Sequence, residues 1–181
     1  MDMERCKWCN IKNPLYIQYH DTEWGKERLD DAYLFEMLLL ESFQAGLSWE
    51  CVLNKRENFK AAFDGFDAYK IAAYDAAKQQ ELAEDAGIIR NRRKIAAAVT
   101  NAAVFLRICD ECGSFEAYLR LFWDGNTIYE NALTHSPLSD AISKDLQKRG
   151  MKFVGTTIIY SYLQAAGVIN SHEERCFLYR P

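Results

Sequence analysis

The chain has 181 residues, of which 49% are hydrophobic and 13% aromatic, with only three prolines. This length fits one domain, predicted over residues 1–181, and the composition supports a proper core, which excludes a disordered protein. No stretch approaches the roughly 20 uncharged apolar residues of a membrane span, and the opening "MDMERCKW" lacks signal-peptide features. We therefore expect no membrane partner and a cytoplasmic location, where thiols stay reduced.

The formal net charge of −4 argues mildly against a polyanionic partner, but the charge is unevenly distributed. Residues 87–107 contain no acid and carry the basic side chains Arg90, Arg92, Arg93, Lys94 and Arg107. A second basic cluster, around Gly150, contains Lys144, Lys148, Arg149 and Lys152. Such patches can bind phosphates. The alternative is that these basic residues are only the solvated faces of surface helices.

Apolar residues recur at helical spacing almost throughout, without an alternating strand pattern, so the predicted fold class is all-α. Helices are predicted over 32–46, ending near Gly46, and over 48–63, with Ser48 as N-cap. Further helices are predicted over 76–87, 92–109, 114–123 (capped by Ser114) and 139–150. Residues 153–167 include the β-branched run "VGTTII", which could form a strand, but their length and "YLQAAG" end favour a helix.

Two Cys-x-x-Cys pairs, Cys6–Cys9 and Cys109–Cys112, raise the question of a zinc ribbon or a redox dithiol. About 100 residues separate the pairs, against roughly 15–20 between the halves of a zinc ribbon. A redox dithiol normally opens a helix beside a βαβ pattern, and no strands are predicted. Cys109 is expected to act as a small hydrophobe, on a helix face with Ile95, Val99, Ala102 and Leu106.

A different metal site is suggested by the two chain ends. His172 and Cys176 have a His-x-x-x-Cys spacing, which places both side chains on one face of a helical turn. Together with Cys6 and His20 they form a Cys₂His₂ set, one of those that close a tetrahedral zinc site. Such a site would join the two ends, but the spacing is a weak signal, and ordinary tail residues are the alternative.

A ligand pocket is suggested by aromatic residues around one carboxylate. The first fifty residues are rich in tryptophan and tyrosine, among them Trp8, Tyr16, Tyr19, Trp24 and Trp49. Glu41 follows Met37 and Leu34 by four and seven positions, which places it on an apolar, inward-facing side of its helix. A buried carboxylate needs a partner, and one beside aromatic planes suits a flat, hydrogen-bonding, cationic ligand. Core packing is the alternative for the aromatic residues.

Six ordered blocks carry a resemblance that covers nearly the whole chain: "ERCKW", "PLYIQYHDTEWG", "LFEMLLLESFQAGLSW", "VLNKRENFKAAF", "DAGIIRNRRKI" and "KRGMKFVGTTIIYSYLQAAGVINSH". On these blocks the chain resembles the DNA-3-methyladenine glycosylase I family of bacterial base-excision repair enzymes. The resemblance implies an all-α, helix-hairpin-helix glycosylase fold with a structural zinc held by Cys6, His20, His172 and Cys176. It also implies a base pocket of Glu41, Tyr19 and Trp49, walled by Trp8, Tyr16 and Trp24.

The resemblance further implies an activity and a partner. The protein would flip 3-methyladenine out of double-stranded DNA and hydrolyse its N-glycosidic bond, leaving an abasic site, as a monomer at the bacterial nucleoid. Glu41 would be the catalytic carboxylate. Phosphate would be held at the hairpin "MKFVG" by Lys152, Gly155 and Thr156, while Gly46 and Leu47 fill the gap left by the flipped base. An ordinary helix–helix turn is the alternative for this hairpin.

Two positions depart from the family pattern. No cysteine is expected at Cys9, so it should not be a metal ligand. Ser171 stands where many relatives carry an acid, so no catalytic role is assigned to that position.

Two other kinds of protein are alternatives to a glycosylase. A non-catalytic, zinc-stapled nucleic-acid-binding module gives no reason for Glu41 beside aromatic residues. A zinc hydrolase needs an open coordination position, which four protein ligands would close.

Overall fold

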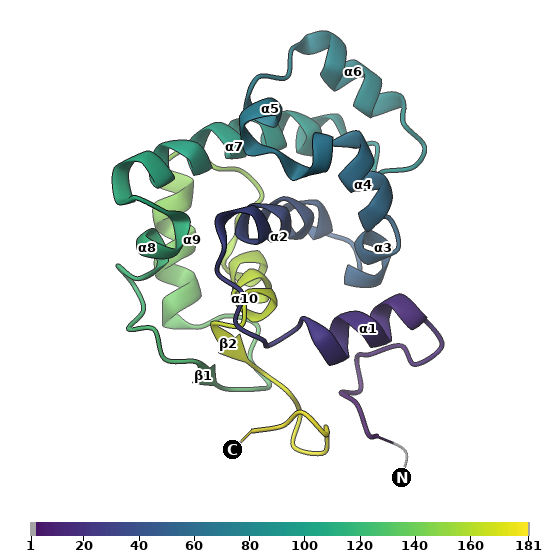
Figure 1. The fold of residues 1–181 in the computed structure, drawn as a ribbon, viewed down its shortest axis with the longest axis vertical. Coiled ribbons are helices and arrows are strands. Elements are labelled where there is room, and N and C mark those ends of the chain that lie inside the picture. The colour runs from purple at the N-terminus through teal and green to yellow at the C-terminus, as the bar shows by residue number, and fades with distance from the viewer. Residues whose placement is uncertain (1–2, 181) are drawn as a thin grey trace.

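The computed structural model describes residues 3–180, in which helices predominate (Figure 1). In chain order the helices are α1 (Pro14–Thr22), α2 (Asp31–Gln44), α3 (Trp49–Leu53), α4 (Arg56–Ala62), α5 (Ala68–Ala72), α6 (Ala76–Glu84), α7 (Arg92–Cys112), α8 (Phe115–Leu119), α9 (Pro137–Lys148) and α10 (Thr156–Ala165). A 3-10 turn, η1 (Asp64–Phe66), follows α4, and there are two short strands, β1 (Ile128–Tyr129) and β2 (Ile169–Asn170).

Polar caps explain where several of these helices begin. The helix predicted over 32–46 is α2, and Asp30 caps it by accepting a hydrogen bond from the Tyr33 backbone N–H. Ser48 and Ser114, both predicted as N-caps, each accept a hydrogen bond from the backbone N–H three residues further on. The helix predicted from residue 139 begins earlier, at Pro137, because Ser136 forms a capping box with Ser139.

The single helix predicted over residues 48–63 is wrong. The chain forms α3 and α4 instead, separated by Asn54 and Lys55. The break places the Arg56 guanidinium 2.9 Å from the Glu23 carboxylate and 2.7 Å from that of Glu36. Helical periodicity does not report such tertiary ion pairs, which is why the pattern predicted one helix. The short helices α1 and α5 have no counterpart among the predicted elements.

The fold is mostly helical, as predicted, and adds one short strand pair that the sequence did not predict. Strands β1 and β2 pair in parallel, with Ile128 opposite Ile169 and Tyr129 opposite Asn170. A strand of two residues is too short to show alternating hydrophobicity, so the sequence carries no signal for it. The pairing brings the segment before α9 beside the segment after α10, and both segments contribute to the cavity described below.

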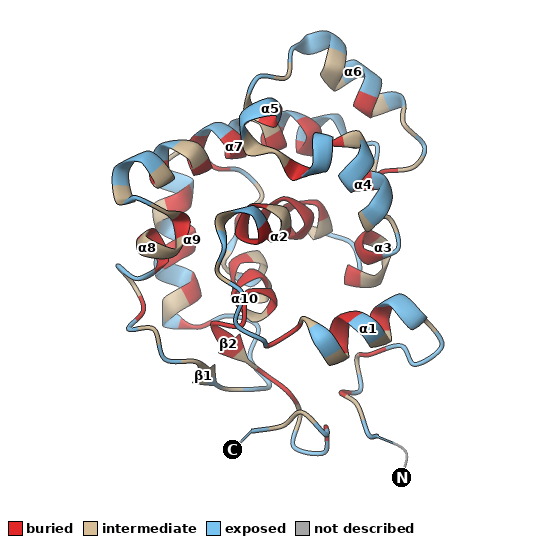
Figure 2. Ribbon diagram, viewed as in Figure 1, coloured by how far each residue is buried: buried red, intermediate tan, exposed pale blue. Residues whose placement is uncertain are grey.

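Helix α2 occupies the middle of the molecule and is buried along most of its length (Figure 2). Its side chains Leu34, Met37, Leu38 and Phe43 are fully buried. Helices α7 and α10 pack against α2, and α9 packs against α10. Helix α1 and the C-terminal segment lie at the same end of the molecule, so the two chain ends are close together (Figure 1).

The buried face of α7 is rotated by about one position from the predicted face. Ile95 and Ala102 are buried as predicted, whereas Val99, Leu106 and Cys109 are only half-buried. Residues Ala98, Phe105 and Ile108 fill the core in their place. Cys109 packs at the edge of the core, as expected of a small hydrophobe, and burial raises the pKa of its thiol to about 12.

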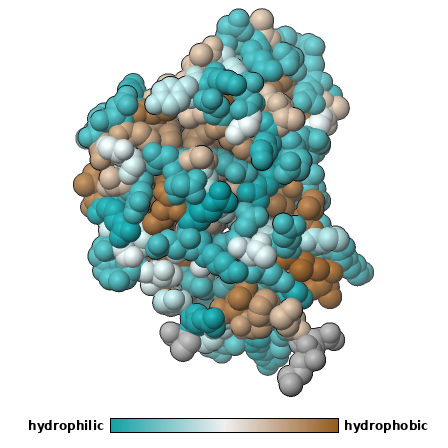
Figure 3. Space-filling model, in the orientation of Figure 1, coloured by the Kyte–Doolittle hydropathy of each residue, from teal (hydrophilic) through white to brown (hydrophobic). Residues whose placement is uncertain are grey.

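The face of the molecule in Figure 3 is mostly hydrophilic, with separate hydrophobic areas rather than one broad apolar band. Among the described residues, no helix combines the length and the apolar character that crossing a bilayer requires.

Candidate functional site

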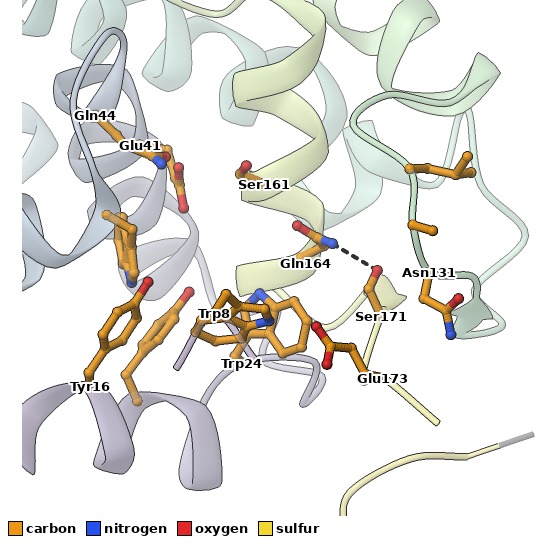
Figure 4. A pocket seen from close by; sticks show the side chains of 14 residues that line it. Trp8, Tyr16, Trp24, Glu41, Gln44, Asn131, Ser161, Gln164, Ser171 and Glu173 are labelled. Carbon is orange, nitrogen blue, oxygen red and sulfur yellow. Dashed lines mark hydrogen bonds between the residues drawn. The ribbon is translucent and has the colours of Figure 1, made fainter. Parts of the chain in front are cut away.

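A cavity of about 380 Å³ opens between α1, α2, α3, α10 and the segments around β1 and β2 (Figure 4). All six residues predicted for the base pocket line it: Trp8, Tyr16, Tyr19, Trp24, Glu41 and Trp49. These residues come from the N-terminal segment, from α1 and the turn that follows it, and from α2 and α3. The structure therefore brings together side chains that are up to 41 positions apart, from Trp8 to Trp49.

Glu41 extends from α2 into the cavity and is only 2% exposed (Figure 4). Its Oε2 atom has no hydrogen-bond partner among the described residues. Burial alone raises the pKa of Glu41 well above its usual value, since no cation or donor in the described part of the chain offsets the loss of solvent. A buried carboxylate without a partner is costly, so its place in the cavity suits a ligand that brings hydrogen-bond donors or positive charge.

Two further polar atoms in this cavity lack partners. Gln44 Oε1 and Trp49 Nε1 are buried without a hydrogen bond among the described residues. Gln44 follows Glu41 by three positions on α2, so helical spacing could have identified it beside the carboxylate. The cavity thus offers acceptors on α2 and an indole donor on α3, all available to one ligand.

Aromatic rings form much of the remaining wall. The Trp8 ring lies 4.6 Å from Trp24 and 5.3 Å from Tyr16, measured between ring centroids. Tyr19 and Trp49 lie 5.1 Å apart. Burial raises the pKa of Tyr16 to about 12, so this hydroxyl stays protonated at neutral pH. Rigid aromatic planes of this kind can stack against a flat heterocycle.

The opposite wall contains residues that the sequence did not predict. From the loop after β1 come Asn131, Ala132 and Leu133, from α10 come Ser161 and Gln164, and from the C-terminal segment come Ser171 and Glu173. The side chain of Gln164 donates to Ser171 Oγ at 2.7 Å (Figure 4). Ser161 and Gln164 are three positions apart and share a helix face, but nothing in the sequence directs that face toward Glu41.

A second cluster joins the two ends of the chain. The donor atoms of Cys6, His20, His172 and Cys176 all lie within 4.8 Å of one another, and all four residues are buried. The Sγ atoms of Cys6 and Cys176 each lie 3.5 Å from His172 Nδ1, and Cys176 Sγ lies 3.5 Å from His20 Nε2. A tetrahedral zinc with ordinary bond lengths would give an S···N edge of roughly 3.5–3.6 Å.

The surroundings of this cluster orient its histidines for metal binding. His20 Nδ1 lies 2.8 Å from the Asp21 carboxylate, and His172 Nε2 lies 3.3 Å from the Trp24 carbonyl oxygen. In each ring one nitrogen can donate to its acceptor, which leaves the other nitrogen unprotonated toward the cysteines. Burial lowers the pKa of His172 to about 4, which favours the neutral, ligating form.

The cysteines of the cluster are also suited to a cation. The backbone N–H of Glu173 donates to Cys6 Sγ, and that of Leu178 donates to Cys176 Sγ. Burial raises the pKa of Cys6 to about 12, so a nearby cation is needed to hold it as a thiolate. Cys9 is buried, but its sulfur lies 3.7 Å from the Tyr16 carbonyl oxygen and outside the cluster. The donor set therefore fits a four-coordinate structural metal.

The predicted DNA-contacting residues lie on two exposed loops. Leu47, which is 42% exposed, and Gly46, with φ +78°, form the turn between α2 and α3. Lys152 and Gly155 are exposed in the hairpin between α9 and α10. A Cβ added to Gly155 would meet nothing within 4 Å and its φ is −60°, so neither packing nor torsion requires glycine there. The space outside its backbone is open to a ligand.

Two residues with expected phosphate roles are engaged within the protein. The Thr156 hydroxyl contacts Ser139 Oγ at 2.9 Å and also hydrogen-bonds to Asp140. Only its position at the N-terminus of α10 remains consistent with phosphate binding. The prediction that Lys94 belongs to a phosphate-binding surface patch is wrong. Its side chain is buried and donates hydrogen bonds to backbone carbonyls.

Comparison with known proteins places the chain in a family. The family model described as methyladenine glycosylase matches residues 8–179. DNA-3-methyladenine glycosylase 1 of Escherichia coli (strain K12) is 46% identical over 183 residues, which cover 98% of this chain and 97% of that protein.

Solved structures agree with this placement. A crystal structure of 3-methyladenine DNA glycosylase I matches with a TM-score of 0.93 at 45% identity, and the match covers 98% of this chain and 100% of the other. A substituted 3-methyladenine DNA glycosylase I, solved in complex with 3-methyladenine, matches with a TM-score of 0.91 at 33% identity over 97% of both chains. The chain belongs to the methyladenine glycosylase family, which confirms the resemblance seen in its sequence.

Proposed function

We propose that this protein is a DNA glycosylase that flips 3-methyladenine out of double-stranded DNA and hydrolyses its N-glycosidic bond, leaving an abasic site. The observation that carries the proposal is the set of unpartnered polar atoms of Glu41, Gln44 and Trp49 in an aromatic cavity. Membership of the methyladenine glycosylase family and the 3-methyladenine complex of a relative support it.

Charge explains how the cavity would select the lesion. In DNA, N3-methylated adenine is cationic, whereas ordinary adenine is neutral and a poorer leaving group. Trp49 stacks on the cationic purine, and Glu41 accepts hydrogen bonds from its edge while offsetting its charge. The positive charge of the lesion also favours the ionised form of Glu41, which burial disfavours in the empty cavity. Ordinary adenine gains none of this charge pairing.

The reaction itself needs little covalent help from the protein. The bond between the sugar C1′ and the base nitrogen breaks, and its electron pair neutralises the cationic purine. Water adds to C1′ and releases a proton to solvent. Because the base is already a good leaving group, holding it flipped and oriented supplies most of the rate. Glu41 is the catalytic residue in this scheme, since its charge contacts the departing base.

Two loops would hold the DNA. Helices α9 and α10 with residues 149–155 between them act as a helix-hairpin-helix, in which the N-terminus of α10 at Gly155 and Thr156 meets a phosphate. Lys152 adds positive charge at the same loop. On the other loop, Leu47 follows Gly46 at the surface and enters the gap that the flipped base leaves.

The metal in the Cys₂His₂ cluster is proposed to be zinc in a structural role. Cys6, His20, His172 and Cys176 would hold it, and four protein ligands leave no open position for catalysis. When bound, the ion keeps the two thiolates charged and joins the chain ends. Trp24 and Trp8 pack directly on the ligand rings, with Trp24 4.7 Å from His172 and Trp8 5.3 Å from His20. The cluster therefore also supports the aromatic wall of the cavity.

We propose a single domain over residues 1–181, whose residues 1–2 and 181 lie outside the described part of the chain. It acts as a monomer on alkylated duplex DNA in the bacterial cytoplasm, at the nucleoid.

The decisive experiment measures release of free 3-methyladenine from duplex DNA treated with a methylating agent. Purified protein should release the base and leave abasic sites, and Glu41→Ala should release far less. If the purified parent protein binds the DNA and releases no base, the chain is a binding module and the proposed activity is wrong.

A further inference from the structure

Helix α7 places a lysine in the interior of the protein, and no acidic side chain between residues 3 and 180 lies at bonding distance from it. Lys94 is 5% exposed, and its ammonium donates hydrogen bonds to the backbone carbonyls of Phe43 at 2.7 Å and Ala45 at 2.6 Å. Burying an ammonium group costs free energy unless strong hydrogen bonds replace water. One bond goes to Phe43 in the last turn of α2, and the other goes to Ala45, the C-cap of that helix.

The local position of Lys94 is unfavourable for a cation. It follows Arg92 and Arg93 in the first turn of α7, and the positive end of the helix dipole disfavours positive charge there. At its other end, the ammonium meets the C-terminus of α2, where carbonyl oxygens are left without helical partners and a cation is favoured. Lys94 therefore stabilises the C-terminal end of α2 rather than its own helix, α7.

The end of α2 leads directly into the loop that we assign to the flipped-base gap. Ala45 leaves the helical conformation, with φ −46° and ψ 114°, and Gly46 follows with φ +78°. Lys94 thus holds the carbonyl that precedes Gly46 and Leu47. Gln44 of the cavity lies between the two carbonyls that Lys94 bonds.

A second buried polar side chain of α7 holds the other loop. Asn101 is 3% exposed, and its amide oxygen accepts from the Lys152 backbone N–H at 2.8 Å. Its amide nitrogen donates to the Lys152 carbonyl at 2.9 Å. The Asn101 side chain therefore bonds both the backbone N–H and the backbone carbonyl of Lys152 in the hairpin. The adjacent Phe153 adopts φ +56° and places its ring 5.8 Å from the Lys94 ammonium.

Lys94 and Asn101 are seven positions apart, so they share a face of α7 about 10 Å apart along its axis. We propose that they are positioning residues, which set the distance between the turn 45–47 and the hairpin 149–155 so that both loops engage one DNA duplex. This inference rests on the proposed function, in which the turn fills the gap and the hairpin holds a phosphate. Neither side chain touches the DNA in this scheme.

The test compares Lys94→Met and Asn101→Leu, which keep the side-chain volume roughly constant, with Lys78→Met. Lys78→Met is the control, because it removes one lysine charge from α6, far from both loops (Figure 1). The Lys78 side chain is half-buried and pairs with Glu81 at 2.8 Å, so the control also removes a bonded ammonium. Single-turnover excision from alkylated duplex DNA should fall roughly tenfold or more in the first two variants. Binding of free 3-methyladenine, followed by tryptophan fluorescence, should stay within about twofold, because the cavity itself is retained.

The salt dependence of duplex binding separates positioning from direct contact. The slope of log K against log salt should be unchanged in Lys94→Met, because a buried lysine contacts no phosphate. A slope reduced by about one would mean that Lys94 itself reaches the DNA, and the inference would be wrong.

Four other outcomes are possible. Excision at the parent rate in both variants would overturn the inference while leaving the proposed function intact. Parallel loss of free-base binding would reduce both residues to supports of the fold. If Lys94→Met does not fold, Asn101→Leu provides the same comparison. A parent protein that releases no base would instead overturn the proposed function.

Discussion

The Cys₂His₂ cluster and the polar groups of the cavity are both buried but differ in how their hydrogen bonds are satisfied. In the Cys₂His₂ cluster, His20 hydrogen-bonds to the Asp21 carboxylate and His172 to the Trp24 carbonyl oxygen. The sulfur of Cys6 accepts a hydrogen bond from a backbone N–H. In the cavity, by contrast, Glu41 Oε2, Gln44 Oε1 and Trp49 Nε1 have no partner among the described residues. Ligands whose other hydrogen bonds are satisfied suit a permanently bound ion. Buried polar groups without partners suit a ligand that binds reversibly.

Removing a ligand from the supported cluster should have the largest effect on stability. Cys176→Ala should lose the metal and lower the free energy of unfolding by about 3 kcal/mol or more, though by less than the roughly 10–16 kcal/mol of a zinc-finger peptide, because a large core remains. Metal content by mass spectrometry and urea unfolding give the two readouts. Cys9→Ala is the matched control, since this buried cysteine lies outside the cluster. Metal loss in Cys9→Ala but not in Cys176→Ala would reverse the ligand assignment.

Removing the charge from the unpartnered cluster should instead affect activity without loss of stability. Glu41→Gln keeps the shape and one carbonyl acceptor but cannot pair with a cationic purine. Excision should fall roughly ten- to a hundredfold, because a hydrogen bond to a charged group is worth about 1.5–3 kcal/mol. Binding of free 3-methyladenine, which can be neutral, should fall less. A folded Glu41→Gln protein that excises at the parent rate would make Glu41 a core residue and refute the recognition scheme.

The same carboxylate should leave a signature in the pH dependence of folding. Burial raises the pKa of Glu41, so the folded state keeps this proton over a pH range in which the unfolded chain has released it. The free energy of unfolding should therefore decline as pH rises from the ordinary glutamate pKa toward the raised folded value, and then level off. Urea unfolding of the parent and Glu41→Gln over this range should show the decline only in the parent. Identical curves would mean that Glu41 is not buried and unpartnered in solution.

These differences also explain what the sequence could predict. Glu41 and its helix were predictable because one amphipathic period places the carboxylate with Leu34 and Met37 on a buried face. The four metal ligands could be grouped from both chain ends by residue type, but their spacing was a weak signal that the resemblance strengthened. Gln44 could have been predicted beside Glu41, because it follows Glu41 by three positions on the same helix.

The opposite wall of the cavity was beyond prediction for a physical reason. Asn131 and Ser171 line one cavity, and the segments that carry them are joined by the two-residue pairing of β1 and β2. Ala132 adopts a positive φ of 62°, which no local sequence motif predicts. Lys94 was misjudged because charge alone suggests the surface. Its burial depends on carbonyls at the end of α2, about 50 residues earlier in the chain.

The smallest predicted effect concerns the exposed hairpin, where a charge acts on DNA without taking part in either buried cluster. Lys152→Ala removes one exposed ammonium, while its backbone remains bonded to Asn101. Duplex binding should weaken modestly, and the slope of log K against log salt should fall by about one, the value for a single phosphate contact. Free-base binding and stability should not change, because the side chain contributes to neither the cavity nor the core. Lys148→Ala, at the end of α9, tests whether any basic residue nearby gives the same result. An equal change in slope for both variants would mean that the hairpin attracts DNA by its general charge, and that Lys152 makes no specific phosphate contact.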